Sequence, residues 1–227
     1  ARELSGVKSF YNYVLMLDKI ELSPAEFIST PKTRRELPDV LTVEEVERII
    51  GMVDTTTVKG RRDRAMLEML YSCGLRVTEL ISLKLSDLFL GEGYIRVMGK
   101  GSKQRLVPIG SVAMEWLMQY LEDRRDMLKD NGGKGGSEQT LFLSNRRTKL
   151  TRVMIFTIIR KSASDAGITK RVSPHTFRHS FATHLFAGGA SIRQVQEMLG
   201  HESIETTEIY THLDTSRLRE TVEKLSL

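Results

Sequence analysis

The segment Pro174–His179 brings together side chains that can bind an anion. His175 and Arg178 are three residues apart, so on a helix they share a face. Two nitrogen donors that project together suit the oxygens of a phosphate. A zinc site is the weaker interpretation, because His175, His179 and His184 have helical spacing but no acidic ligand or HExxH pattern joins them. A lone HxxR pair more often caps neighbouring carbonyls, so its function depends on the rest of the chain.

Four more residues extend this set. Arg76 follows a helix stop at Gly74, Lys100 lies at a glycine-flanked hairpin tip, and His201 comes just past a helix end. Tyr210 follows in a polar segment; a tyrosine hydroxyl with a pKa of about 10 is a poor nucleophile unless cations favour the phenolate. Together these residues suit metal-free phosphoryl transfer, in which arginines neutralise the phosphate and a lysine protonates the departing oxygen. Taken alone, Tyr210 fits a packing aromatic better than a nucleophile.

Basic residues are segregated along the chain. The whole chain has 34 Lys and Arg against 29 Asp and Glu, a net charge of +5. The stretch 141–189 has nine Lys or Arg and one acid, Asp165, and a second basic patch consists of Arg96, Lys100, Lys103 and Arg105. Such segregation is typical of a nucleic-acid-binding face, and a solvated basic surface is the alternative. With only 7% aromatic residues, a stacking platform for single strands is disfavoured.

The hydrophobic pattern predicts a mainly helical α+β fold with one small antiparallel sheet. Capping boxes begin at Thr42 and Ser191, and Ser173-Pro174 is a typical helix start. Helices are expected over 2–17, 43–53, 60–73, 77–84, 111–129, 151–166, 174–186, 191–199, 203–210 and 215–225. A hairpin is expected over 94–98 and 104–109, and a glycine-rich loop over 131–137.

Proline spacing predicts two parts joined by a linker. Pro31 and Pro38 bracket an extended segment, so 29–40 is interpreted as a linker between residues 1–28 and a catalytic domain over 41–227. The helix over 2–17 cannot bury its own apolar stripe, so we expect it to be the end of a domain whose earlier part is absent. The last helix, 215–225, has a narrow apolar stripe that needs a cover.

Composition excludes several classes of protein. With 227 residues and 40% hydrophobic content, the chain is neither a disordered tail nor a membrane-embedded bundle. It has no apolar run near the roughly 18 residues that span a bilayer, and no signal peptide opens it. Its one cysteine, Cys73, excludes a disulfide framework and is expected to be a buried thiol. These features fit a cytosolic protein.

The ordered polar set resembles the tyrosine recombinase (phage integrase) family, most closely its bacterial Xer branch. Lys100 lies 24 residues after Arg76 and His201 lies 23 after Arg178, spacings that are similar to the Xer pattern. The matching stretches are Gly74–Leu80, Gly99–Arg105, Ser173–His184, Leu199–Ser203 and Ile209–His212.

The resemblance implies a role for each residue. Tyr210 would attack a DNA phosphate to form a 3′-phosphotyrosyl link, Arg76 and Arg178 would bind the nonbridging oxygens, and His201 would add a hydrogen bond. His175 would assist proton transfer at Tyr210, and Lys100 would be the general acid. Glu79 is expected to orient Arg76 as a neighbour of the site. No cofactor, metal or ATP is implied, because the covalent link retains the phosphodiester energy.

The resemblance also implies partners. These are duplex DNA at a specific recombination site, a homo- or hetero-tetramer with a paralogous recombinase, and a DNA translocase as activator, with no membrane partner and a cytoplasmic, nucleoid-associated location. DNA contacts are expected from Arg146, Arg147, Arg152 and Lys161, mainly to phosphates. Residues 1–28 would be the last helix of a core-binding (SAM-like) domain, and 215–225 would be an oligomerisation helix that docks on a neighbouring protomer, or else packs on its own domain.

Several functions stay open at this point. Chromosome dimer resolution is favoured over a mobile-element integrase by the Xer-like motifs. A type IB topoisomerase would share the cleavage chemistry without strand exchange, and a catalytically silent DNA-binding protein would need no intact polar set.

Overall fold

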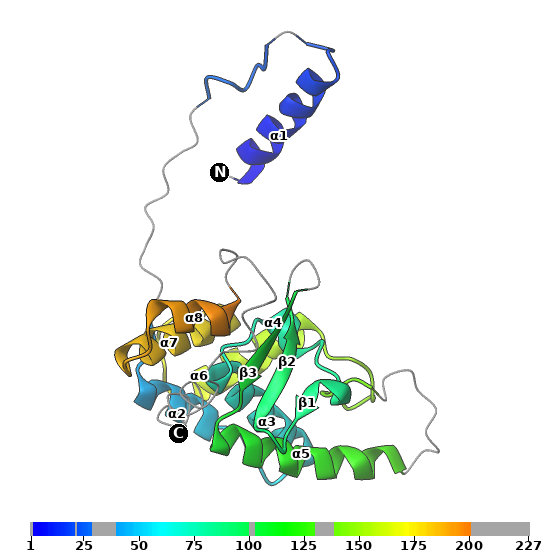
Figure 1. Cartoon of the computed structure of the whole chain (residues 1–227), viewed down its shortest axis with the longest axis vertical. Helices are drawn as coiled ribbons and strands as arrows, with labels where there is room; N and C mark the ends of the chain where they lie inside the picture. Colours follow the sequence, from blue (N-terminus) through cyan, green and yellow to red (C-terminus); the bar gives the residue numbers. More distant parts are fainter. Residues whose placement is uncertain (1, 21, 29–39, 100–102, 130–138, 201–227) are drawn as a thin grey trace. The chain divides into compact units, whose positions relative to one another are not determined.

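The computed structural model describes residues 2–20, 22–28, 40–99, 103–129 and 139–200 (Figure 1). Lys100, His201 and Tyr210 lie outside these residues, as do the expected loop 131–137, most of the linker and the expected helices 203–210 and 215–225. The chain forms two compact units, Ala1–Leu37 and Pro38–Leu227, which are described separately.

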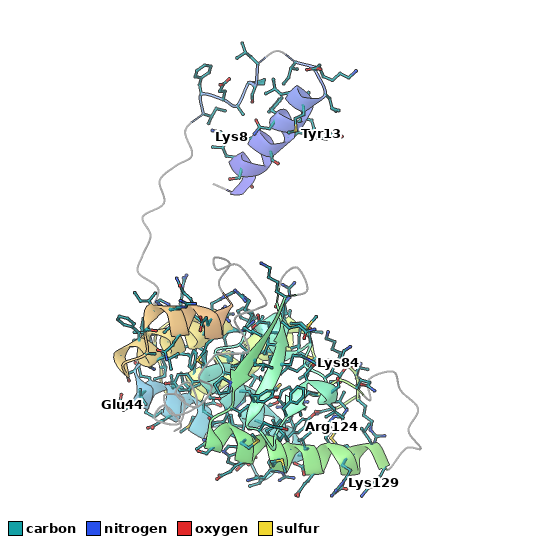
Figure 2. The ribbon with its side chains drawn as sticks, in the orientation of Figure 1. Lys8, Tyr13, Glu44, Lys84, Arg124 and Lys129 are labelled. Atoms are coloured by element: carbon teal, nitrogen blue, oxygen red, sulfur yellow. The ribbon has the colours of Figure 1, made fainter. Side chains whose placement is uncertain are left out.

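The first unit contains helix α1 (Arg2–Met16) and an irregular segment after it. The apolar side chains of this helix are largely exposed within the described residues. Phe10 and Tyr13 are both 60% exposed and Met16 is 85% exposed; Tyr13 is labelled in Figure 2. The helix therefore has an apolar surface that the described part of the unit does not cover.

The second unit is mainly helical with one small antiparallel sheet, which confirms the predicted fold class. Its helices are α2 (Val43–Gly51), α3 (Val58–Ser72), α4 (Val77–Leu80), the 3-10 turn η1 (Leu85–Asp87), α5 (Ser111–Lys129), α6 (Arg152–Asp165), α7 (Pro174–Ala187) and α8 (Ile192–Leu199). Its strands are β1 (Leu88–Phe89), β2 (Tyr94–Met98) and β3 (Gln104–Pro108), in the order β1-β2-β3.

Helix α3 lies at the centre of the core. It packs against α5 and α7, and Leu67, Leu70 and Tyr71 are buried along it. Figure 1 shows α5 running below the strands of the sheet. In the hairpin, Ile95 pairs with Val107 and both are buried, so the alternating strand pattern turns one face toward the core. The fold thus holds the sheet and the helices α3 and α7 together as one packed body.

The predicted helix over 77–84 is shorter than expected and the strand β1 was missed. Helix α4 ends at Leu80, because the following residues pair with another part of the chain instead of continuing the helix. The Leu141 N–H donates to the Leu83 carbonyl at 2.9 Å, and the Leu85 N–H donates to the Gln139 carbonyl at 2.9 Å. This long-range pairing outweighs the local helical pattern.

The second unit begins with an anchored segment. The Leu41 N–H donates to Ser180 Oγ on α7 at 2.9 Å, and Lys170 Nζ donates to the Val40 carbonyl at 3.0 Å. Thr42 then caps α2 through the predicted capping box with Glu45. The chain therefore enters this unit against the helix that carries His175 and Arg178.

Gly74 ends the α3 region in a backbone conformation that a side chain cannot share. Its φ is +54°, and an added Cβ would lie 2.4 Å from Cδ1 of the buried Phe181. We expect Gly74→Ala to lower the free energy of unfolding by about 2–4 kcal/mol, from overpacking and left-handed strain together. Denaturant titration checks this.

Gly167→Ala is the matched control for that variant. Gly167 has a φ of +69°, but a Cβ there meets no atom within 4 Å, so only the backbone strain is expected. Equal destabilisation of the two variants would contradict the overpacking at Phe181.

Candidate active site

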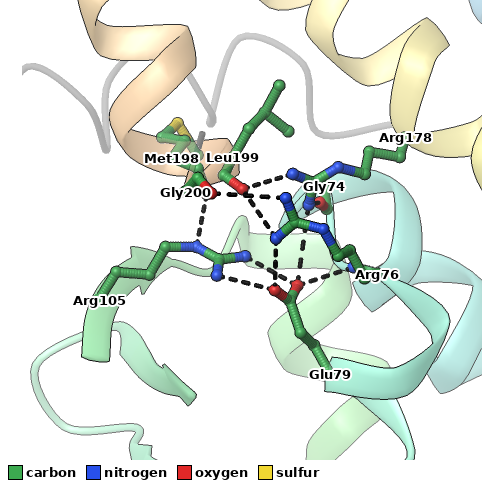
Figure 3. A network of polar contacts seen from close by, with 8 residues as sticks. All are labelled: Gly74, Arg76, Glu79, Arg105, Arg178, Met198, Leu199 and Gly200. Carbon is green, nitrogen blue, oxygen red and sulfur yellow. Dashed lines mark hydrogen bonds and ion pairs between the residues drawn. The ribbon is translucent and has the colours of Figure 1, made fainter. Parts of the chain in front are cut away.

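A buried carboxylate, Glu79, lies at the centre of a cluster of arginines (Figure 3). Its position follows from local structure, because Glu79 is the third residue of α4 and its Oε2 accepts the Arg76 N–H at 2.8 Å. Arg76 Nη1 also donates to Glu79 Oε1 at 2.9 Å. The three-residue spacing of a capping box thus places the carboxylate beside Arg76.

Arg105 holds the same carboxylate from the sheet. It lies on β3, is 5% exposed, and donates from Nη1 and Nη2 to the two oxygens of Glu79 at 2.9 and 2.8 Å. Its Nε donates to the Met198 carbonyl at 2.8 Å. Arg105 therefore connects the hairpin, helix α4 and the end of α8, as Figure 3 shows.

Arg178 reaches the cluster from α7. Its Nη1 donates to the Gly74 carbonyl at 2.6 Å, and its Nη2 donates to the Leu199 carbonyl. Nη1 also lies 3.7 Å from Glu79 Oε2. The guanidinium is thus held by backbone carbonyls of two segments that are far apart in the sequence.

The last turn of α8 supplies carbonyls to both predicted phosphate-binding arginines. Arg76 Nη1 lies 3.3 Å from the Leu199 carbonyl oxygen, which Arg178 shares, and Arg76 Nη2 lies 3.4 Å from that of Gly200. Gly200 ends the helix with a φ of +62°. This fixes the backbone immediately before His201, the next residue in the chain.

Burial and charge act in opposite directions on these groups. Burial alone would raise the pKa of Glu79, but hydrogen bonds from Arg105 and Arg76 outweigh it and the pKa lies below its ordinary value. Burial lowers the pKa of Arg178 to about 10, and the neighbouring Arg76 adds to this effect. At neutral pH the cluster therefore has three cations around one carboxylate, an arrangement that favours binding of a further anion.

Three of the sequence-predicted residues meet in this cluster: Arg76, Arg178 and Glu79. His175 is exposed in the first turn of α7, one turn before Arg178. Lys100, His201 and Tyr210 fall outside the described residues, so their roles stay predictions.

The four predicted DNA contacts lie elsewhere in the second unit. Arg146 and Arg152 are exposed, and Arg147 is half-buried with a φ of +59°. Lys161 on α6 is exposed and pairs with Asp165 at 2.6 Å. Figure 3 includes none of them in the arginine cluster, so their part in binding stays a prediction.

Arg105 was missed as a site residue, although a signal for it exists in the sequence. On the predicted strand over 104–109 it alternates with Gln104 and Leu106, which places it on the buried face with Val107. A charged residue on the inward face of a strand needs a buried partner. That rule points to a carboxylate opposite it, which the structure identifies as Glu79.

Other predicted features have simpler outcomes. Cys73 is buried, as expected, and burial raises the pKa of its thiol to about 12. Within the described ranges no group of three or more His, Cys, Asp or Glu side chains could hold a metal ion. His184 instead has its Nδ1 2.8 Å from the Tyr71 hydroxyl. No helix in the part of the chain described is both long and apolar enough to cross a membrane.

Comparison with known proteins identifies the family. The profile of the phage integrase family matches residues 39–217. A protein of Chlorobaculum tepidum named tyrosine recombinase XerD is 46% identical over 223 residues, which cover 97% of this chain and 72% of that protein. A tyrosine recombinase XerD of Listeria innocua is 44% identical over 220 residues, covering 97% and 73%.

Solved structures agree with this assignment. The crystal structure of XerA recombinase matches with a TM-score of 0.65 and 35% identity, covering 96% of this chain and 73% of that one. XerH bound to its difH substrate before cleavage matches with a TM-score of 0.64 and 28% identity, covering 80% and 52%. The chain therefore belongs to the phage integrase family and is a tyrosine recombinase of its Xer branch, an enzyme that cleaves and rejoins DNA through a phosphotyrosine intermediate.

Proposed function

We propose that Tyr210 attacks a backbone phosphate of duplex DNA held by Arg76 and Arg178. The observation that carries this proposal is the convergence of the two guanidinium groups on the Leu199 carbonyl and on Glu79. A guanidinium has five N–H donors, more than the carbonyls that hold Arg178. Two cations fixed in this way can stabilise the charge that develops on nonbridging oxygens without reorganising during the reaction.

The reaction balances within this set of residues. The Tyr210 oxygen forms a bond to phosphorus while the bond from phosphorus to O5′ breaks. His175 assists removal of the tyrosine proton, Lys100 protonates the departing O5′, and His201 donates to a nonbridging oxygen. Attack by the 5′-hydroxyl of a partner strand reverses the step. The 3′-phosphotyrosyl link retains the energy of the phosphodiester, so no ATP is consumed.

Lys100 has support from the geometry around it. The Gly99 N–H donates to the Lys103 carbonyl at 2.8 Å, which closes the β2–β3 hairpin around the turn that contains Lys100. Arg105, at the base of the same turn, is bonded to Glu79. The hairpin is thereby fixed to the arginine cluster on the side from which the turn extends.

The biological role that we propose is chromosome dimer resolution at a specific DNA site by four protomers. Its support is the 44–46% identity to proteins named XerD, and the solved XerH complex with difH. We further propose that a paralogous recombinase and a DNA translocase take part, that the enzyme acts at the nucleoid, and that α1 belongs to the DNA-clamping domain of the family. Helix 215–225 would couple neighbouring protomers.

A suicide duplex tests the proposed reaction. Duplexes that bind the protein are first selected from a randomised pool, and a nick is then placed beside each candidate phosphate so that the released fragment diffuses away. We expect an adduct that resists detergent and retains the label 5′ of the cut, on the 3′-phosphate. Absence of an adduct on every bound duplex would contradict cleavage. Relaxation of a supercoiled plasmid without the selected site would favour a topoisomerase instead.

Binding to DNA is expected to weaken steeply with salt. Each Lys or Arg that contacts a phosphate releases counterions, so about 6–10 contacts imply an affinity loss of about 10³–10⁵-fold between about 50 and about 200 mM salt. We expect Arg152→Gln to make the slope shallower by about one ion. Fluorescence anisotropy over a salt series measures it.

Arg125→Gln provides the matched control for the salt series. Arg125 is also exposed, but it lies on α5 near Asp126. Its replacement is expected to leave the slope unchanged. Equal slopes for the wild type and Arg152→Gln would contradict a phosphate contact at Arg152.

A further inference from the structure

Arg105 is a buried cation whose position the proposed chemistry does not yet use. Its guanidinium bonds both oxygens of Glu79 and the Met198 carbonyl, and it is 5% exposed. We propose that Arg105 is a positioning residue for cleavage, which holds Arg76 and Arg178 in the geometry that receives the phosphate. This inference rests on the proposed function, in which those two arginines bind the scissile phosphate.

The first step of the argument concerns the carboxylate. The fork of Arg105 lies along both oxygens of Glu79, and a bidentate pair of this kind fixes the plane of a carboxylate. Arg76 then bonds Oε1 by one Nη, while Arg178 stays 3.7 Å from Oε2. Without Arg105, the buried charge of Glu79 would be compensated only by these two arginines. It would draw their N–H groups away from an incoming phosphate.

The second step concerns the end of α8. Arg105 Nε bonds the Met198 carbonyl, and a Cβ added to Gly200 would lie only 3.0 Å from Arg105 Nη1. The adjacent Leu199 carbonyl is the one that Arg76 and Arg178 share. Arg105 therefore holds both groups that orient the two phosphate-binding arginines, namely the Glu79 carboxylate and the last turn of α8.

The test compares Arg105 with a buried arginine of the same kind. Arg62 is 4% exposed, donates from Nε and Nη2 to Asp63 Oδ1 at 2.9 and 2.7 Å, and donates from Nη1 to the Leu143 carbonyl at 2.9 Å. Arg105→Met, Arg105→Lys and Arg62→Met are compared with the wild type in the full chain. Thermal unfolding, DNA affinity and single-turnover cleavage of the suicide duplex are measured for each.

We expect Arg105→Met to cleave about 10²-fold more slowly than the wild type, because misplacement of groups near the reacting atoms has an effect of this size. DNA affinity is expected to stay close to that of the wild type. Arg105→Lys should fall between the two, because an ammonium keeps the charge but cannot form the fork. Arg62→Met should lose stability but cleave at the wild-type rate when folded.

A second substrate separates positioning from a general loss of structure. A methylphosphonate at the cleavage site lacks one charged oxygen, so cleavage depends less on the two arginines. The rate deficit of Arg105→Met should therefore shrink by about tenfold or more on this substrate. An equal deficit on both substrates, or a deficit that Arg62→Met shares, would overturn the positioning role.

The remaining outcomes are also decisive. If Arg105→Met does not fold, Arg105→Lys carries the same comparison, and wild-type cleavage by that variant would overturn the need for the fork. A wild-type chain that forms no adduct on any bound duplex would overturn the proposed function and this role together. A wild-type chain that cleaves while Arg105→Met cleaves equally well would overturn this role alone.

Discussion

Tyr210→Phe is expected to abolish the covalent adduct while DNA affinity stays near that of the wild type. The substitution removes only the attacking oxygen and keeps the ring, so the basic surface that binds DNA is unchanged. Denaturing gel analysis of a labelled suicide duplex measures the adduct, and anisotropy measures the affinity. Among the expected effects this is the largest, because no bond to phosphorus can form without the oxygen.

Tyr94→Phe is the control for that experiment. Tyr94 lies on β2, and its ring stacks on Phe89 with the centroids 4.8 Å apart. Its replacement removes one hydroxyl from an aromatic residue of the same domain and should leave the adduct unchanged. An adduct that persists in Tyr210→Phe would mean that another residue is the nucleophile.

Arg178→Met is expected to reduce single-turnover cleavage by about 10³–10⁵-fold, the range that arginines contribute in phosphoryl transfer. Its guanidinium is buried and its pKa lies at about 10, so it is a cation at neutral pH at the point where negative charge develops. The change also leaves the Gly74 and Leu199 carbonyls without this donor, which costs about 1–3 kcal/mol of stability for each buried group. Cleavage is therefore measured at a temperature where circular dichroism reports folded protein.

A second buried arginine separates catalysis from stability in this experiment. Arg124 is 5% exposed and also bonds backbone carbonyls, at 3.0 Å to Leu141 and at 2.8 Å to Thr140. Arg124→Met is expected to lose stability and to cleave at the wild-type rate when folded. Comparable cleavage rates for the two variants would show that Arg178 has no catalytic effect of its own.

Local rules predicted most of the second unit. The strand over 94–98 and the helix over 111–129 have the bounds expected from the sequence, and the starts of α2 and α7 follow from the caps at Thr42 and Ser173. Caps and alternation depend on residues a few positions apart, so the sequence states them directly. Helix α4 ended early because Leu83 and Leu85 pair with residues near 140, which no local pattern indicates.

The candidate site shows the same division. Glu79 beside Arg76 follows from a spacing of three residues and was expected. Arg105 beside Glu79 joins residues 26 positions apart, and Arg105 beside Met198 joins residues 93 positions apart. Strand alternation places Arg105 on the buried face but does not say which element packs against it. The anchoring half of the cluster therefore required the three-dimensional structure.

The entry of the chain at Leu41 gives the second unit a mechanical junction. The Leu41 N–H is bonded to Ser180, which lies two residues from Arg178 on α7, and the preceding Val40 carbonyl is bonded to Lys170. Tension that arrives along the backbone from the amino-terminal side is thereby transmitted to α7 close to a phosphate-binding arginine. A movement of the first unit can load that helix without any direct contact between the two units, and the load passes through hydrogen bonds that re-form when it is released.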